Sequence, residues 1–184
     1  MGDQISIRRN LGIPTNERVI LYAPTWRNEQ RSKSSNKWDK FIESDELAFK
    51  TNSFVLLRSH HVAKIRPNKG EAVLDVSQCP HIEDLMAIAD ILVTDYSSII
   101  YDFSLTGRPI IQHLPDVKQY RSERGLEEGF TKHSCAVTST QDELIEAINS
   151  LTLGSCAIAQ PRNVLKSSMD VEMLLTYAAG VARW

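Results

Sequence analysis

The chain has 184 residues, of which 42% are hydrophobic, so its length and composition suit one compact domain with a substantial core. Its 21 basic and 23 acidic residues leave a formal net charge of -2, which argues against a nucleic-acid binder. No apolar run approaches the ~20 residues of a membrane-spanning helix. The three cysteines have no paired spacing, which favours reduced thiols in a cytoplasmic protein.

Short runs rich in valine, isoleucine and leucine alternate with segments of helical periodicity along the chain. We expect strands at Val19–Tyr22, Phe54–Leu57, Val73–Val76, Ile91–Val93, Pro109–Ile111 and Ala136–Thr138. We expect helices at Trp38–Lys50, Ile82–Ala89, Ser97–Thr106, Gln141–Leu151 and Asn163–Ala179. Strands that are apolar on both faces and alternate with helices predict a parallel sheet covered on both sides. The predicted fold is therefore α/β, a Rossmann-like doubly wound parallel sheet.

The domain organisation follows from the position of the first strand. Residues 1–18 contain no predicted strand and are interpreted as a linker or N-terminal extension, and residues 19–184 as one Rossmann-like domain. Two local signals support the helix ends. Gly107 suits a left-handed C-terminal cap, and Thr140 with Glu143 forms a capping-box pattern.

Polar residues follow four of the predicted strands. They are Pro24-Thr25-Trp26-Arg27, Arg58-Ser59-His60-His61, Thr94-Asp95-Tyr96-Ser97-Ser98 and Gln112-His113. In open parallel sheets, ligands bind beyond the carboxyl ends of the strands. These four groups should therefore converge on one rim, which makes a binding site plausible there.

The segment "TDYSS" places polar residues where a helix begins directly after a strand. Backbone N–H groups at such a start can bind an anion, and the hydroxyls of Ser97 and Ser98 can add two donors. Asp102 lies one turn after Ser98 on the same helix face, where its carboxylate could accept hydrogen bonds from a ribose diol. The alternative is that Asp95 or Ser97 merely caps the helix. The lack of a glycine, which phosphate loops normally contain, slightly favours capping.

His60, Thr25 and Arg27 follow other predicted strands. Each could bind or act on a ligand, or could be an ordinary surface residue. An imidazole at His60 could take a proton from an attacking hydroxyl or bind phosphate, because its pKa lies near neutrality; the alternative is an ordinary surface histidine. Thr25 and Arg27 could reach a diphosphate, or could simply mark a solvated strand exit. The five histidines and three cysteines do not fall at metal-ligand spacing, so neither a metal nor a cofactor is predicted.

Three separated motifs resemble one family. They are "LYAPTWR" (21–27), "LRSHH" (57–61) and "ADILVTDYSSIIYDFSLTGRPII" (89–111). In this order the chain resembles the CDP-glycerol glycerophosphotransferases, which polymerise teichoic acid and capsule polymers, over roughly Leu11 to Leu151. The resemblance implies the C-terminal nucleotide-binding half of a two-domain GT-B transferase, which we expect to be inactive alone because its cleft lacks the other wall.

The resemblance also implies a role for each site residue. His60 would be the catalytic histidine near the transferred phosphate. Ser97 and Ser98 would hold the diphosphate, and Asp95 would organise their turn. Asp102 would face the ribose, and the cytosine would lie near Ile82. The nucleotide-binding set implied in this way is Thr25, Arg27, Arg58, Ile82, Asp95, Ser97, Ser98 and Asp102.

The implied function is transfer of glycerol phosphate from CDP-glycerol, or a related CDP-polyol, to a hydroxyl of a growing polyol-phosphate chain. Such a protein would be cytoplasmic and peripheral at the inner face of the plasma membrane, without nucleic-acid partners. Two alternatives stay open. One is a GT-B sugar or sugar-phosphate transferase that uses another nucleotide donor, and the other is a non-catalytic nucleotide-binding scaffold.

Overall fold

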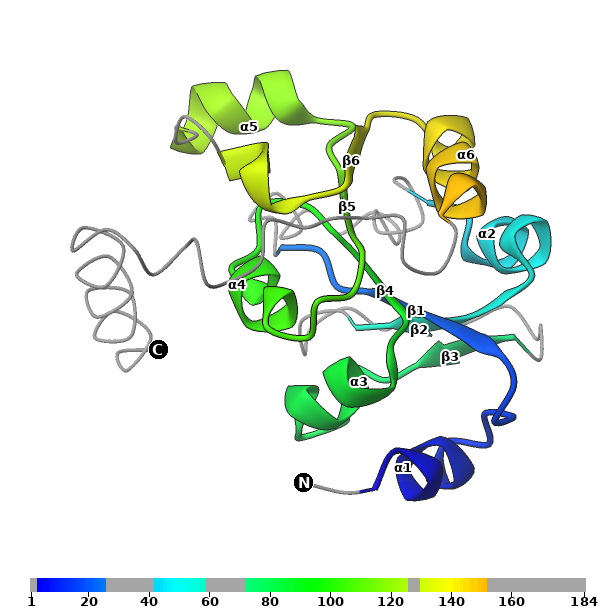
Figure 1. The fold of residues 1–184 in the computed structure, drawn as a ribbon. Coiled ribbons are helices and arrows are strands. Elements are labelled where there is room, and N and C mark those ends of the chain that lie inside the picture. The colour runs from blue at the N-terminus through cyan, green and yellow to red at the C-terminus, as the bar shows by residue number, and fades with distance from the viewer. Residues whose placement is uncertain (1–2, 26–41, 59–71, 126–129, 152–184) are drawn as a thin grey trace, which may run out of the picture.

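In the computed structural model, the described residues, which are 3–25, 42–58, 72–125 and 130–151, contain a six-stranded sheet (Figure 1). Its strands are β1 (Arg18–Tyr22), β2 (Ser53–Leu57), β3 (Val73–Asp75), β4 (Ile91–Thr94), β5 (Ile110–His113) and β6 (Ala136–Thr138). Every neighbouring pair is parallel, and the spatial order is β3-β2-β1-β4-β5-β6. This is the doubly wound order of a Rossmann-like fold, so the predicted fold is confirmed.

Helices cover both faces of the sheet (Figure 1). They are α1 (Gln4–Asn10), α2 (Ser44–Thr51), α3 (Ile82–Ile88), α4 (Ile99–Ser104), α5 (Val117–Arg124), the 3₁₀ helix η3 (Phe130–His133) and α6 (Gln141–Ser150). One buried cluster joins the sheet to α1, α3 and α4, and a second joins the opposite face to α2 and α6. The core therefore consists of two apolar layers separated by the sheet.

The central strand β1 shows why this sheet must be covered twice. Val19 and Leu21 belong to the cluster with α3, whereas Ile20 and Tyr22 belong to the cluster with α2. Successive side chains of a strand point to opposite faces, so a run that is apolar throughout needs a helix on each side.

Several local predictions are confirmed. All six predicted strands are present with ends shifted by at most two residues, and Gly107 has the left-handed φ of 68°. At α6, the Thr140 side chain accepts from the Glu143 amide, which completes the capping box. The predicted Trp38–Lys50 helix begins only at Ser44, because the backbone of Glu43 is extended and forms the N-cap. Residues 38–41 of that prediction and the whole predicted Asn163–Ala179 helix lie outside the described residues.

The segment before β1 is more ordered than a linker. It forms helix α1, which the sequence did not predict and which packs against α3. Arg8 donates to the Ile88 carbonyl at 3.1 Å and pairs with Asp90 at 3.3 Å. Ile7 and Ile13 are buried in the same cluster. The N-terminal extension is thus part of the packed domain from residue 3 onward.

One cysteine bears on the expectation of reduced thiols. Cys79 is a free thiol and is half-buried.

Candidate functional site

The centre of the carboxyl edge lies between β1 and β4. These neighbours pair in register from Ile20 with Ile91 to Tyr22 with Val93, so both strands end at the same level. From β1 the sheet continues to β2 and β3 on one side, and from β4 to β5 and β6 on the other. The strand order reverses between them, and ligands bind at such a switch point in open α/β sheets.

The Asp95 carboxylate ties the two strand ends together. Its Oδ1 accepts hydrogen bonds from the Thr25 amide at 2.7 Å, the Thr25 hydroxyl at 2.6 Å and the Tyr96 amide at 2.6 Å. Asp95 is only 4% exposed, and three donors compensate for the burial of its charge. The Thr94 hydroxyl adds a parallel link by donating to the Ala23 carbonyl at 2.6 Å. Asp95 therefore organises the turn instead of capping α4.

The two serines stand at the start of α4. Ser98 is the N-cap residue, yet its side chain makes no capping hydrogen bond. Ser97 accepts from the Ile99 amide at 3.4 Å, which is long for such a bond. Both side chains are partly buried. The capping alternative therefore explains little of these two hydroxyls, which can serve a ligand. The amides of the first helical turn are already engaged, because Ile100 donates to the Ser97 carbonyl at 3.4 Å and Tyr101 to the Ser98 carbonyl at 3.0 Å.

Asp102 lies on α4 and faces the beginning of α3. Partial burial raises the pKa of its carboxyl, and the nearby charge of Glu83 raises that pKa further. Because Glu83 is in the first turn of α3, Asp102 belongs to the side of α4 nearest the segment expected to meet the cytosine.

Two further predicted site residues, Arg58 and Ile82, lie near the start of α3. Arg58 donates from one guanidinium nitrogen to the carbonyls of Cys79 at 2.7 Å and Val76 at 3.4 Å, so it fastens the loop that leads into α3. Ile82 packs its side chain against the core cluster, which leaves backbone groups to face a ligand there. Arg27 and His60 lie outside the described residues.

A second layer of residues supports the Asp95 turn. The Tyr96 hydroxyl donates to Asp116 at 3.2 Å, and its ring stacks on Tyr120 of α5 with centroids 3.6 Å apart. Gln112, at the end of β5, donates to the Asp95 carbonyl at 3.1 Å. Of these contacts, only that of Gln112 has a sequence signal, because a polar residue there ends an apolar strand. The contacts of Tyr96 join residues 20 and 24 positions apart and carry no periodic signal.

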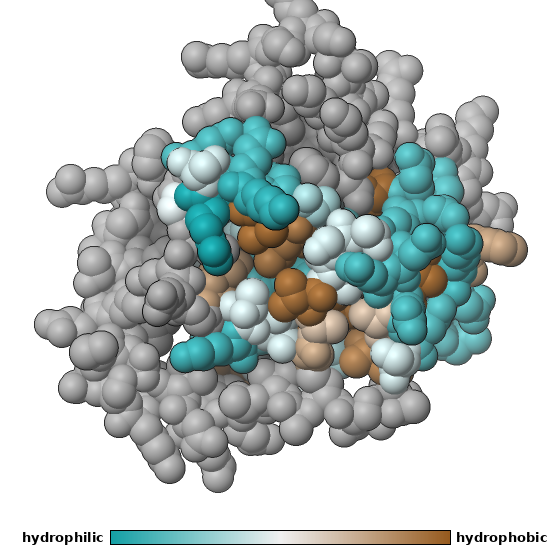
Figure 2. All heavy atoms as spheres, turned by 90° about the horizontal axis from the view of Figure 1, so that it is seen from above, coloured by the Kyte–Doolittle hydropathy of each residue, from teal (hydrophilic) through white to brown (hydrophobic). Residues whose placement is uncertain are grey.

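Figure 2 shows the face that carries α5 and α6. Hydrophobic residues lie in the middle of this face, with hydrophilic side chains over α5 on one side and over α6 and α2 on the other. The apolar centre and polar flanks match the usual make-up of a ligand-binding surface.

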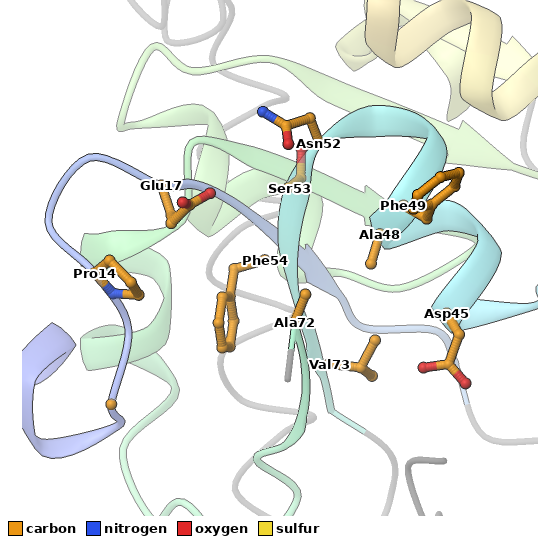
Figure 3. A pocket seen from close by; sticks show the side chains of 11 residues that line it. Pro14, Glu17, Asp45, Ala48, Phe49, Asn52, Ser53, Phe54, Ala72 and Val73 are labelled. Carbon is orange, nitrogen blue, oxygen red and sulfur yellow. The ribbon is translucent and has the colours of Figure 1, made fainter. Parts of the chain in front are cut away.

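A cavity lies at the opposite, amino edge of the sheet (Figure 3). It has a volume of about 740 Å³, and Glu17 and Asp45 lie on opposite sides of it. Its apolar lining comes from Pro14, Ala48, Phe49, Phe54, Ala72 and Val73. Two carboxylates disfavour an anion by charge, so this cavity is a poor place for a diphosphate.

The parallel sheet and its order define a Rossmann-like α/β domain. A family model described as CDP-glycerol:poly(glycerophosphate) glycerophosphotransferase matches residues 2–169. The chain belongs to this family.

Characterised relatives support the assignment. The chain is 35% identical over 155 residues to a teichoic acid poly(glycerol phosphate) polymerase of Bacillus subtilis, and 36% identical over 157 residues to one of Bacillus spizizenii. These matches cover 79% and 80% of this chain but only 21% and 39% of the relatives.

Solved structures agree with the sequence relatives. The wall teichoic acid polymerase TagF superposes with a TM-score of 0.71 at 27% identity, over 80% of this chain and 38% of that one. A TagF variant soaked with CDPG gives a TM-score of 0.69 with the same coverage. The chain thus corresponds to less than half of these enzymes.

Proposed function

We propose that this chain is the nucleotide-binding domain of a CDP-glycerol glycerophosphotransferase. It binds the CDP moiety and helps to transfer glycerol phosphate to a hydroxyl of a growing cell-wall or capsule polymer. The observation that carries the proposal is the serine turn fastened by Asp95 at the switch point of a chain in this family. The names of the polymerase relatives support the same reaction.

The reaction is a substitution at phosphorus. The acceptor hydroxyl attacks the β-phosphate of CDP-glycerol, a new P–O bond forms, and the P–O bond to CMP breaks. Negative charge spreads over the phosphoryl oxygens in the transition state, so positioning and hydrogen-bond donors supply most of the catalysis. The hydroxyl proton must leave during the attack, and His60 is proposed as the base that takes it or as a ligand of the transferred phosphate.

The described residues have distinct proposed roles. Ser97 and Ser98 donate to the diphosphate through their side-chain hydroxyls. Thr25 acts through Asp95, because both its amide and its hydroxyl already donate to that carboxylate. Asp102 accepts hydrogen bonds from the ribose, and Arg27 is proposed as a further diphosphate ligand.

We further propose that the complete protein acts at the inner face of the plasma membrane, where it meets a polyol-phosphate acceptor. The names of the relatives, which are teichoic acid poly(glycerol phosphate) polymerases, support the polyol-phosphate acceptor. No helix among the described residues is long and apolar enough to cross a bilayer. Co-sedimentation with anionic vesicles tests the peripheral contact, and a protein that stays entirely in the supernatant would contradict it.

Calorimetric titration of the 184-residue chain with CDP, UDP and GDP tests the proposed function. CDP should bind at least tenfold more tightly than the other two. A clear preference for UDP or GDP would instead support a transferase with another donor. We also expect no transfer from CDP-glycerol by this chain alone, and measurable turnover would contradict that expectation.

A further inference from the structure

Gln112 is a buried polar side chain beside the proposed phosphate-binding turn. It is 0% exposed at the carboxyl end of β5, where the preceding strand residues Ile110 and Ile111 are apolar. An amide is retained in such surroundings only where hydrogen bonds replace those that it made to water. The contacts of Gln112 therefore indicate what the residue does.

Both ends of the Gln112 amide are engaged. Its Nε2 donates to the Asp95 carbonyl at 3.1 Å, and its Oε1 accepts from the Ser134 hydroxyl at 2.9 Å. The Asp95 carbonyl can only accept, so a flipped amide would place two oxygens against each other. Ser134 reinforces this orientation, although its hydroxyl also lies 2.9 Å from the Thr131 carbonyl and shares its single proton.

Gln112 completes the support of Asp95. The carboxylate of Asp95 is held by Thr25 after β1, and its backbone carbonyl is held by Gln112 from β5. The peptide between Asp95 and Tyr96 is thus fixed on both sides. This peptide sets the direction in which the chain enters Ser97 and Ser98.

We propose that Gln112 is a positioning residue that holds the 95–98 turn in its ligand-binding conformation. It reaches a bound nucleotide only through the Asp95 carbonyl. The inference rests on the proposed function, in which this turn holds the diphosphate. Loss of the side chain should therefore loosen the turn and weaken diphosphate binding more than it weakens the fold.

Thr51 offers a matched control at the other edge of the sheet. It is 2% exposed, and its hydroxyl donates to the Leu47 carbonyl at 2.7 Å. Like Gln112, it is a buried polar residue with a hydrogen bond to a backbone carbonyl. Gln112→Leu and Thr51→Val both remove such a bond while they keep most of the side-chain volume.

Calorimetric titration with CDP compares the two variants with the unmodified chain. Gln112→Leu should weaken CDP binding at least tenfold, and Thr51→Val should change it less than twofold, although both lower the melting temperature. Equal affinities in the two variants would overturn the proposal. Ser134→Ala should weaken binding by a smaller factor, and should add nothing to Gln112→Leu because it acts through Gln112; additive losses would also contradict the proposal.

Amide hydrogen exchange without nucleotide separates this inference from the proposed function. Exchange of the amides in residues 96–98 should be more than tenfold faster in Gln112→Leu than in Thr51→Val. Both variants are measured at the same pH and without denaturant. If the unmodified chain fails to bind CDP, the proposed function is wrong, and the exchange rates still decide the role of Gln112. Unchanged exchange within the turn would overturn that role.

Discussion

The carboxyl and amino edges of this sheet are built differently. At the carboxyl edge, Asp95 gathers three short hydrogen bonds and leaves serine hydroxyls at a helix start. At the amino edge, Arg18 donates to Ser53 at 2.8 Å, and a cavity of about 740 Å³ lies beside that strand end. The wall of this cavity includes Asp45, one oxygen of which is buried without a hydrogen-bond partner.

The size of a cavity therefore does not locate an anion site. A diphosphate needs donors and positive potential, and carboxylates on a wall oppose it. The carboxyl edge provides serine hydroxyls, held by a network that spans several strands. The amino edge provides space, but two carboxylates, Glu17 and Asp45, line it.

The two aspartates should differ most in stability. Asp95→Ala leaves buried donors of Thr25 and Tyr96 without their acceptor, and should lower the free energy of unfolding by about 3 kcal/mol. Asp45→Ala removes a carboxylate whose buried oxygen has no partner, and should cost less than about 1 kcal/mol. Urea denaturation measures both. Equal losses would show that the Asp95 network does not stabilise the fold.

Removal of the serine hydroxyls should weaken binding without unfolding the chain. Ser97→Ala with Ser98→Ala should raise the Kd for CDP at least tenfold, which corresponds to about 1.4 kcal/mol. Stability should change by less than about 0.5 kcal/mol, because Ser98 makes no capping bond. Ser53→Ala is the control at the amino edge, where it should lower stability and leave affinity unchanged. Unaltered CDP affinity in the double variant would refute the phosphate assignment.

Neutralising the amino-edge cavity should have almost no effect on CDP. Glu17→Gln with Asp45→Asn removes two negative charges from its wall, and the Kd should stay within twofold. If the nucleotide occupied this cavity, loss of like charge would tighten binding severalfold. Calorimetry at low salt, where such an effect is largest, distinguishes these outcomes.

Asp102 should give the smallest effect, and one that depends on pH. Burial and the charge of Glu83 raise the pKa of Asp102. At any pH above that raised pKa, the charged carboxylate therefore destabilises the folded state relative to the unfolded state. Asp102→Asn should therefore raise Tm at pH 7, by about 1 °C because the side chain is exposed and screened. The gain should vanish below the usual aspartate value of 3.8. A gain that persists at pH 3 would point to another cause.

Much of the fold could be predicted from the sequence because it depends on local patterns. Apolar runs marked the strands, Gly107 marked a helix end, and Thr140 with Glu143 marked a helix start. Helix α1 was missed, because its short sequence contains Arg8 and polar residues that are stabilised by distant partners. Arg8 pairs with Asp90, 82 residues further along the chain.

The sequence indicated which residues lie at the carboxyl edge, but not which of them contact one another. The motif pointed to Asp95 as the organiser of the turn, but its partner Thr25 lies 70 residues away. Arg58 stays a predicted nucleotide ligand, and the hydrogen bonds that one of its guanidinium nitrogens donates to backbone carbonyls have no signal in the sequence spacing. Such bonds depend on which strands become neighbours, and that becomes known only once the sheet is assembled.

Hydrogen exchange of the chain with and without CDP reports where the nucleotide lies. Protection should appear at the carboxyl edge, in residues 96–99 and in the loop that Arg58 fastens before α3. Residues 52–54, beside the amino-edge cavity, should exchange at the same rate in both states. Protection confined to residues 52–54, or none in residues 96–99 at saturating CDP, would contradict the assignment of the diphosphate to the Asp95 turn.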